Sequence, residues 1–485
     1  MPGPNLVFIF TDEQRADTMA AYGNDRIHTP YLNRLAMQSV IFDRAYVTQP
    51  ICTPSRSSLL TGLYPHTNGC TRNNVPLRAD TPCFPEMLPP GAYATAYYGK
   101  WHLGDEIFAQ HGFDDWRSIE DQYREYYGPG RDRHAHSTYH DFLTANGLTP
   151  SRGEFFERGE TARFPERFSK PAYLAGEASR FIEANKDRPF VLFVNFLEPH
   201  MPFFGPRDGQ YDPAEVSLPA NFDAVPGEGD PLRTRIYYRR YYEQGYDRFA
   251  LRTEADWRRL IANYWGLCSL VDTHLGAILE TLDRCGLAGN TIVVYTSDHG
   301  DMMGSHRLLH KGFMYEESVR VPLLMRVPGA RPGRVARPVS QIDLVPTLLD
   351  LMGERVPAHL EGKSLRPDLE GSGDPRQDVF VEWTDQGGKF LGVVDGEPMP
   401  AFVLEVAEPE RALQAIKEPV RTVITSEGWK LNWRPSGEHE LFDLRRDPGE
   451  TRNLATSRRF HPLIRELAGK IRGWQRNTDD TVDIC

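Results

Sequence analysis

Four continuous apolar runs along the chain are typical of buried strands. They are residues 5–11 (NLVFIFT), 188–196 (RPFVLFVNF), 290–298 (NTIVVYTSD) and 319–327 (VRVPLLMRV). Each run is short and rich in β-branched or aromatic residues, and none shows a regular alternation with polar positions. Runs of this kind predict strands that are covered on both faces, as in a parallel sheet.

Stretches with helical periodicity separate these runs. Residues 31–40, 173–185 and 254–285 carry apolar side chains three and four positions apart, as on one face of a helix. Strand and helix signals therefore alternate along the chain. This alternation predicts an α/β fold with a large, mostly parallel sheet between layers of helices.

Charged side chains follow three of the predicted strands at their carboxyl ends. These acidic and imidazole side chains are Asp12, Glu13, Glu198, His200, Asp298 and His299. In open α/β sheets, ligands bind beyond the carboxyl ends of the strands. We therefore expect these side chains to lie at one site.

The character of the chain changes after about residue 370. A stretch rich in Gly and Pro, EGSGDPRQD, is followed by strand-like pieces, turn-rich sequence and an amphipathic segment, HPLIRELAGKIRGWQ. This order predicts a small antiparallel sheet with a closing helix. The expected division is a large domain over residues 1–372 and a smaller α+β subdomain over residues 373–485.

Two polar regions crowded with aromatic residues, 115–170 and 203–255, interrupt the α/β pattern. One interpretation is that they are insertions over the strand ends, where loops carry specificity. A contact between copies of the chain, rich in Tyr and Arg, would have the same composition. The pattern therefore leaves a homo-oligomer open.

The charge balance restricts the partners that the chain can attract. Its 485 residues carry a formal net charge of −11, and the sequence pI is near 5.8. Because this field repels nucleic acid and anionic membranes, neither is expected as a partner. No apolar run reaches about eighteen residues, and MPGPNLVFIFTDEQ lacks the basic start of a signal peptide, so we expect a cytoplasmic protein.

Six cysteines are scattered along the chain without CxxC spacing. They are Cys52, Cys70, Cys83, Cys268, Cys285 and Cys485. This spacing predicts neither a disulfide framework nor a zinc site. At least one of the cysteines is therefore a candidate for another role.

Cys52 lies in the most informative string of the sequence, ICTPSRSSLLTGLYPH at residues 51–66. Thr53 is a candidate helix N-cap and Pro54 suits the first helical position, which would place Cys52 just before a helix. Free backbone amides there, with Arg56 in the first turn, favour an anion. A low-pKa thiolate would fit this position. CTPSR also matches, at every defined position, the CxPxR signature that sulfatases present to the enzyme that converts cysteine to formylglycine.

The sequence resembles the type I sulfatases of the alkaline phosphatase superfamily. The resemblance rests on ordered motifs over most of the chain: TDEQR, CTPSR with LLTGLYPH, YGKWHLG, EPH, SDHGDMMGSH, HKGFMYEESVRVPL, and GWKLNW with ELFDLRRDPGETRNLA. His299 within SDHG resembles the iduronate sulfatase and phosphonate monoester hydrolase branches. The resemblance implies an alkaline phosphatase-like fold and an enzyme that hydrolyses sulfate monoesters.

The resemblance also implies that Cys52 is the precursor of formylglycine, made by a formylglycine-generating enzyme. In that family the hydrated aldehyde attacks sulfur through one hydroxyl, and the second hydroxyl expels sulfate after the alcohol has left. A serine would remain as a stable sulfate ester, whereas a hemiacetal-type sulfate can collapse to the aldehyde by C–O cleavage. The alternative for Cys52 is an ordinary buried cysteine.

A divalent metal site is expected at the strand ends. Asp12, Glu13, Asp298 and His299 are its candidate ligands, because carboxylates gathered in one pocket repel each other unless a cation lies among them. The resemblance implies that Cys52, once modified, completes the site. Many relatives have Asp in place of Glu13 and some have Asn in place of His299. The oxygen-rich set favours Ca²⁺, and the imidazole leaves Mg²⁺ or Mn²⁺ open.

A sulfate monoester also needs groups that bind its oxygens and that neutralise the leaving alkoxide. The resemblance implies that Lys100 and Arg56 hold the hydrated nucleophile and the oxyanion. It implies that His102 is the base for sulfate release, and that Lys311 with His200 assists departure of the alcohol. His306 and His310 flank this set and are assigned only a supporting role.

Two other functions fit parts of the sequence. A phosphonate monoester or phosphodiester hydrolase would use the same cysteine and the same SDHG pair, although the lysine and histidine of GKWHLG favour sulfate. A metal and oxyanion binding protein without turnover would fit if Cys52 were never converted. The alcohol stays open among aryl sulfates, choline-like alkyl sulfates and sulfated sugars.

Overall fold

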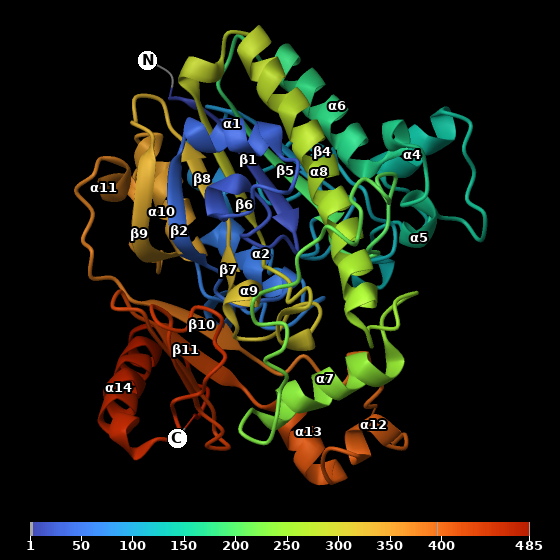
Figure 1. Ribbon diagram of the computed structural model, residues 1–485. Coiled ribbons are helices and arrows are strands. Elements are labelled where there is room, and N and C mark those ends of the chain that lie inside the picture. Colours follow the sequence, from blue (N-terminus) through green and yellow to red (C-terminus); the bar gives the residue numbers. More distant parts are fainter. Residues whose placement is uncertain (1–2, 395, 485) are drawn as a thin grey trace.

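Figure 1 shows the computed structural model of the protein, which describes residues 3–394 and 396–484. Met1, Pro2 and Cys485, which enter the predictions on the N-terminus and on the cysteines, lie outside the described residues. None of the helices in the described part of the chain has the length and apolarity that crossing a bilayer requires.

Nine strands of the described residues form one large sheet, in the order β4-β3-β5-β1-β6-β8-β2-β7 with β9 beside β2. They are β1 (Asn5–Asp12), β2 (Val40–Tyr46), β3 (Ala94–Gly99), β4 (Asp115–Arg117), β5 (Phe190–Pro199), β6 (Thr291–Ser297), β7 (Arg320–Val321), β8 (Leu323–Arg326) and β9 (Gly333–Ser340). Strand β1 is parallel to both β5 and β6, and β3 is parallel to β4 and β5. The prediction of a large, mostly parallel sheet is confirmed.

The run at residues 319–327 is not one parallel strand, as the sequence suggested. It forms two short strands, β7 and β8, which are antiparallel to β2. Pro322 lies between them, and a proline has no N–H to give to a ladder of hydrogen bonds. Strands β2 and β3 were absent from the predicted runs. In β2 the polar pair Asp43 and Arg44 interrupts the apolar sequence.

Helices cover both sides of the large sheet, and further helices lie in the C-terminal region (Figure 1). The longer ones are α1 (Pro30–Met37), α2 (Cys52–Thr61), α4 (Thr138–Ala145), α6 (Lys170–Ala184), α7 (Leu232–Gln244), α8 (Glu254–Arg284), α10 (Leu344–Leu351), α13 (Pro409–Lys417) and α14 (His461–Asn477). The short ones are α3 (Pro65–Asn68), α5 (Arg158–Thr161), α9 (Glu316–Val319), α11 (Arg366–Leu369) and α12 (Ala401–Leu404).

Strand β1 illustrates how the sequence covers both faces of the sheet. Leu6, Phe8 and Phe10 point to one face, and Val7 and Ile9 point to the other. Helices α2 and α10 cover the first face, whereas α1, α6 and α8 cover the second (Figure 1). Because both faces of the strand are buried, its sequence is an uninterrupted run of apolar residues.

The C-terminal region contains the small antiparallel sheet that the sequence predicted. Its strands are β10 (Val379–Trp383), β11 (Val420–Ile424), β12 (Trp429–Trp433) and β13 (Glu440–Asp443). Helix α14 packs on one face of it through Leu467 and Ile471. Val379 and Ile424 belong to the same core as one face of the large sheet. The division at residue 372 stays a prediction.

The two aromatic regions contact one another, since Arg207 pairs with Glu166 at 2.7 Å and the Arg163 guanidinium lies over the Phe204 ring. Residues 115–170 carry α4 and α5, and residues 203–255 carry α7, which lies beside α12 and α13 of the C-terminal region (Figure 1). Segments distant in sequence therefore meet around α7.

Candidate active site

Cys52 is the first residue of α2 and is 2% exposed. The helix begins earlier than the sequence suggested, because Ile51 is its N-cap and Thr53 lies inside it. The hydroxyl of Thr53 donates instead to the backbone carbonyl of His102 at 2.8 Å. The prediction that Thr53 caps the helix is therefore wrong. Pro54 tolerates either start, since an N–H in the first turn has no helical partner.

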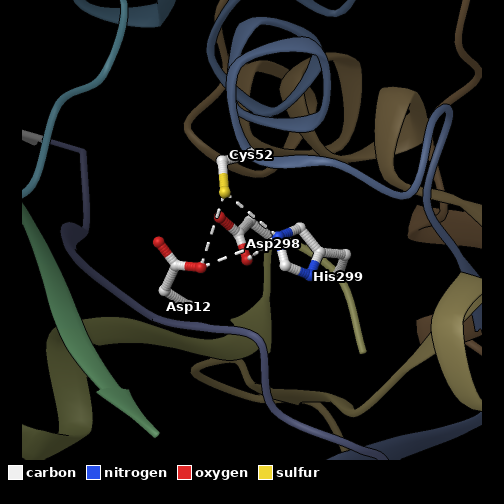
Figure 2. Close-up of side chains that lie close together, drawn as sticks. All are labelled: Asp12, Cys52, Asp298 and His299. Atoms are coloured by element: carbon white, nitrogen blue, oxygen red, sulfur yellow. Dashed lines mark hydrogen bonds and ion pairs between the residues drawn. The ribbon is translucent and has the colours of Figure 1, made fainter. Parts of the chain in front are cut away.

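Four buried side chains meet at the start of this helix (Figure 2). The Sγ atom of Cys52 lies 3.3 Å from Nε2 of His299 and 3.8 Å from Oδ1 of Asp12. Nε2 of His299 lies 3.5 Å from Oδ1 of Asp298. These ligand atoms all lie within 4.8 Å of one another. Two carboxylates, an imidazole and a sulfur atom in this arrangement form a set that can hold a divalent cation.

The sheet brings the two carboxylates together. Thr11 of β1 is paired with Ser297 of β6, so Asp12 and Asp298 leave adjacent parallel strands side by side. The backbone N–H of Glu13 donates to Oδ1 of Asp298 at 3.1 Å, which fixes the orientation of that carboxylate. The expected convergence at the carboxyl ends of the strands is therefore present for Asp12 and Asp298, whereas the charged groups that act on Glu198 are Lys170, Glu120 and Arg158.

His299 is oriented by its own backbone. Its Nδ1 lies 2.9 Å from the carbonyl oxygen of Gly300, so Nδ1 donates there and Nε2 faces the cluster. Burial alone would lower the pKa of His299, but Asp298 beside it raises that pKa to about 9. A cation that binds Nε2 must therefore displace a proton.

Arg56 is fully buried and binds both carboxylates. Its Nη2 lies 2.9 Å from Oδ2 of Asp12, and its Nε lies 2.9 Å from Oδ2 of Asp298. Its Nη1 donates to the carbonyl of Lys100 at 2.6 Å and to Oδ1 of Asn195 at 3.0 Å. Every nitrogen of the guanidinium therefore has a protein partner. In this arrangement Arg56 holds both carboxylates in place.

Lys100 is the second cation on the same carboxylate. Its Nζ lies 2.7 Å from Oδ2 of Asp12 and is buried. Burial would raise the pKa of Asp12, but Lys100, His200 and Arg56 together hold it well below the usual range. Asp12 is therefore an anion that keeps its second oxygen, Oδ1, for the cluster.

Glu13 lies beside the four-residue cluster. Its Oε2 is 2.9 Å from Nζ of Lys311 and 3.5 Å from Nε2 of His200, and its Oε1 is 3.3 Å from Nδ1 of His310. Burial would raise the pKa of Glu13, but Lys311 and His200 lower it well below the usual range. The carboxylate that the sequence assigned to the metal is thus paired with Lys311. It lies close enough to Asp12 and His200 to form a second candidate ligand group.

Asp301 was not among the predicted site residues, although its carboxylate lies beside His310. Asp301 lies 3.8 Å from Nδ1 of His310, and its pKa is raised by burial and by the neighbouring Glu13. Four aromatic rings surround His310: Phe203, Tyr241, Tyr246 and Phe390. Two features of the sequence could have indicated these residues: His310 adjoins Lys311, and Asp301 directly follows SDHG.

His102 adopts a backbone conformation with φ of 62°. Its Nε2 donates to Oδ1 of Asn74 at 2.7 Å, and the ring of Tyr123 lies 4.4 Å from its own ring. The carboxylate of Glu106 accepts the backbone N–H groups of Trp101 and His102 at 2.8 and 2.6 Å. Asn74, Tyr123 and Glu106 were not among the predicted site residues.

The groups of the site differ in their exposure to solvent. Asp12, Asp298 and His299 are 0% exposed, whereas His102 and His200 are 6% and 7% exposed and the Lys311 side chain is 11% exposed. Lys311 and the two histidines are therefore the parts of this group that solvent touches most.

The chain is similar to known proteins over most of its length. The profile of the family described as Sulfatase matches residues 4–354. An N-acetylglucosamine-6-O-sulfatase from Bacteroides thetaiotaomicron is 30% identical over 427 residues, covering 76% of this chain and 71% of that protein. A choline-sulfatase from Rhizobium meliloti is 30% identical over 470 residues, covering 94% of this chain and 83% of that protein.

A solved structure has the same fold. The phosphonate monoester hydrolase from Silicibacter pomeroyi superposes with a TM-score of 0.78 at 24% identity, covering 99% of this chain and 96% of that one. A sequence identity at this level shows only that the fold is shared. The profile match and the two similar sulfatases show the family. The chain therefore belongs to the sulfatase family and is a sulfuric ester hydrolase.

Proposed function

We propose that the chain hydrolyses sulfate monoesters at residue 52, converted from cysteine to formylglycine, with one divalent cation bound by Asp12, Asp298 and His299. One observation carries the proposal. The buried Sγ of Cys52 lies at the start of α2, within 3.3 to 3.8 Å of an imidazole nitrogen and a carboxylate oxygen. A sulfur atom in an apolar core has no need of such neighbours.

The carboxylates of the cluster fit a cation. Lys100 and Arg56 occupy Oδ2 of Asp12, and Arg56 occupies Oδ2 of Asp298. Their Oδ1 atoms therefore face Cys52 and His299. We propose Ca²⁺ because the set is rich in oxygen, with Mg²⁺ or Mn²⁺ as the alternatives. The bound cation would supply a positive charge for the sulfate oxygens and lower the pKa of a hydroxyl at residue 52.

We assign Glu13 to the edge of the metal site, as a ligand that must leave Lys311 in order to bind the cation. Its Oε2 is 2.9 Å from Nζ of Lys311, and it forms a candidate group with Asp12 and His200. Either position keeps its charge beside the reacting group. The position of Glu13 depends on whether its carboxylate binds the cation or the Lys311 ammonium more strongly.

The remaining residues then have defined tasks. Formylglycine would supply a hydrated aldehyde with one hydroxyl to accept the sulfuryl group and one to release sulfate. Lys100 and Arg56 hold Asp12 in its charged form, and Lys100 stabilises negative charge beside residue 52. His102 takes the proton that sulfate release requires. Lys311 and His200 neutralise the departing alcohol.

The alcohol is proposed only as a class: an aryl, alkyl or sugar sulfate. The relatives named for N-acetylglucosamine-6-O-sulfate and choline sulfate illustrate two of the three. The alternative is a phosphonate monoester or phosphodiester hydrolase, which would use the same residue 52 and the same Asp298 and His299 pair. Lys100 and His102 at the site favour the sulfate. The formylglycine-generating enzyme is the proposed maturation partner, and a homo-oligomer stays open.

The test uses the chain produced together with a formylglycine-generating enzyme. Mass spectrometry of the peptide that contains residue 52 measures conversion. Hydrolysis of 4-nitrophenyl sulfate, bis(4-nitrophenyl) phosphate and a phenylphosphonate monoester is then compared at equal conversion. Turnover that scales with conversion and prefers the sulfate supports the proposal. Activity of wholly unconverted protein, or a preference for the phosphorus esters, contradicts it.

A further inference from the structure

His102 is fixed next to residue 52 by its backbone. Its carbonyl oxygen accepts the hydroxyl of Thr53, the residue after Cys52, and its N–H is held by Glu106. Two residues earlier in the chain, Lys100 contacts Asp12. His102 is 6% exposed, so few waters can surround its ring.

Asn74 holds the ring of His102 at one nitrogen. Oδ1 of Asn74 lies 2.7 Å from Nε2 of His102, and the same amide also hydrogen-bonds the side chain of Tyr126. The backbone of Asn74 is fixed as well, since its N–H donates to the hydroxyl of Thr53 at 3.1 Å. A carbonyl oxygen can only accept, so Nε2 of His102 carries the hydrogen.

The other ring nitrogen is free. Nδ1 of His102 is buried and has no hydrogen-bond partner among the described residues. Burial, Lys100 and Arg56 hold the pKa of His102 well below its usual range, while Asp12 opposes them. Arg158 also lowers the pKa of His102. The imidazole is therefore neutral, with one N–H on Asn74 and one unshared lone pair on Nδ1.

We propose that Asn74 is a positioning residue that holds His102 in the tautomer protonated at Nε2, so that Nδ1 is the base nitrogen for sulfate release. The proposal rests on the function proposed above and adds to it a residue and an atom. A base must present a lone pair, and a histidine with the opposite tautomer would present an N–H instead. The hydrogen bond to Asn74 disfavours the tautomer protonated at Nδ1.

The proton and the electrons balance in the step that this base serves. Nδ1 takes the proton from the hydroxyl that remains on the carbon bearing the sulfate. The O–H electron pair forms the C=O bond, and the C–O bond to sulfate breaks. Its electron pair leaves with the sulfate dianion, and His102 becomes an imidazolium that returns its proton to water.

The tautomer can be measured without any turnover. Protein with Cys52 unconverted is labelled with ¹⁵N at histidine, and His102 is assigned by the signal lost in His102→Gln. The expected spectrum shows Nε2 protonated and Nδ1 unprotonated near neutral pH. In Asn74→Gly the second tautomer becomes detectable; glycine suits this position because φ of Asn74 is 65°. A wild-type protein with Nδ1 protonated, or a Gly variant with unchanged nitrogen signals, overturns the proposal.

Kinetics of converted protein provide the second measurement. With 4-nitrophenyl sulfate, Asn74→Gly is expected to release one equivalent of nitrophenol per enzyme in a burst and then turn over roughly 10-fold or more slower than wild type. Asn74→Asp keeps an acceptor for Nε2 and should retain more of the rate. Its carboxylate favours the imidazolium, so the acid limb of its pH profile should move to higher pH.

The outcomes separate this proposal from the one on which it rests. If converted wild type does not hydrolyse the sulfate, the proposed function fails, while the nitrogen signals still decide the tautomer. If it does hydrolyse the sulfate and the Gly and Asp variants lose rate equally with unmoved pH limbs, Asn74 has only a structural role. Asn146→Ala, at the exposed end of α4, is the matched control and should behave as wild type.

Discussion

The ammonium group of Lys100 lies 2.7 Å from Oδ2 of Asp12, and neither side chain is more than 1% exposed. Arg56 reaches the same oxygen at 2.9 Å. Two cations on one oxygen leave the other, Oδ1, directed toward Cys52. The carboxylate is thereby kept ionised and is oriented before any metal or substrate arrives.

Replacement of Cys52 tests whether residue 52 is needed for turnover without being needed for folding. Cys52→Ala should abolish turnover of 4-nitrophenyl sulfate and leave the melting temperature close to that of wild type, because only one buried sulfur is lost. Cys52→Ser should release one equivalent of nitrophenol and stop, since a serine sulfate ester has no route to an aldehyde. A stopped-flow burst and a sulfate adduct on the residue-52 peptide are the readouts. Steady turnover by the Ser variant would contradict the diol mechanism.

Lys100→Met tests the charge beside residue 52. Asp12 keeps Arg56 as a partner, so the variant should fold, whereas one preorganised cation is lost where negative charge develops. Losses of single groups of this kind cost about 10²–10³-fold in kcat. The measurement is kcat and KM with 4-nitrophenyl sulfate at matched conversion. Lys417→Met, at an exposed position of α13, is the control. Equal rates in the two variants would show that the charge of Lys100 does not contribute to catalysis.

Removal of the cation should destabilise the protein as well as inactivate it. A cation that binds only the folded state adds about 2.7 kcal/mol to the free energy of unfolding at a concentration 100 times its Kd. Protein treated with EDTA is therefore expected to melt at a lower temperature, and Ca²⁺ should restore the transition more fully than Mg²⁺ or Mn²⁺.

Asp12→Asn is the control for this experiment, because the substitution removes the charge that the cation needs. The melting temperature of that variant should respond weakly to EDTA and to Ca²⁺. A variant that responds as strongly as wild type would place the stabilising cation elsewhere in the molecule.

The sequence predicted those parts of the site that follow directly from strand ends. Asp12 and Asp298 come straight after β1 and β6, and the pairing of these strands brings the carboxylates together. Apolar runs identify such strands because both faces are buried. The same reasoning failed at residues 319–327, where Pro322 divides the run into two antiparallel strands.

Contacts between side chains could not be predicted in the same way. The hydroxyl of Thr53 suits an N-cap by type, yet in the folded chain it reaches the carbonyl of His102. Asn74 is one of two asparagines in a polar loop, and nothing in the sequence separates it from Asn73. Glu13 adjoins Asp12 along the chain, but its carboxylate turns toward Lys311. Tertiary geometry, which local propensity does not contain, decides each of these contacts.

His66 should make the stability of the protein depend on pH at a place remote from residue 52. It lies in α3, and its Nδ1 is 2.5 Å from Oε2 of Glu382 in β10, while Nε2 is 3.1 Å from the carbonyl of Thr478 after α14. Burial would lower the pKa of His66, but the hydrogen bond and charge of Glu382 raise it above its ordinary value. The protonated ring thus connects α3 to β10 and to the end of α14.

The sign of the effect follows from the raised pKa. A group that binds its proton more tightly when folded stabilises the protein fully below its unfolded pKa, about 6.5, and this contribution is lost as pH rises through the folded pKa. Unfolding by urea near pH 6 and near pH 8.5 should therefore show a larger gap in free energy between wild type and His66→Gln at the lower pH. His28→Gln, at an exposed position, is the control and should show no such trend. A gap that stays constant or widens with rising pH would mean that the His66 and Glu382 pair is neutral in the folded protein.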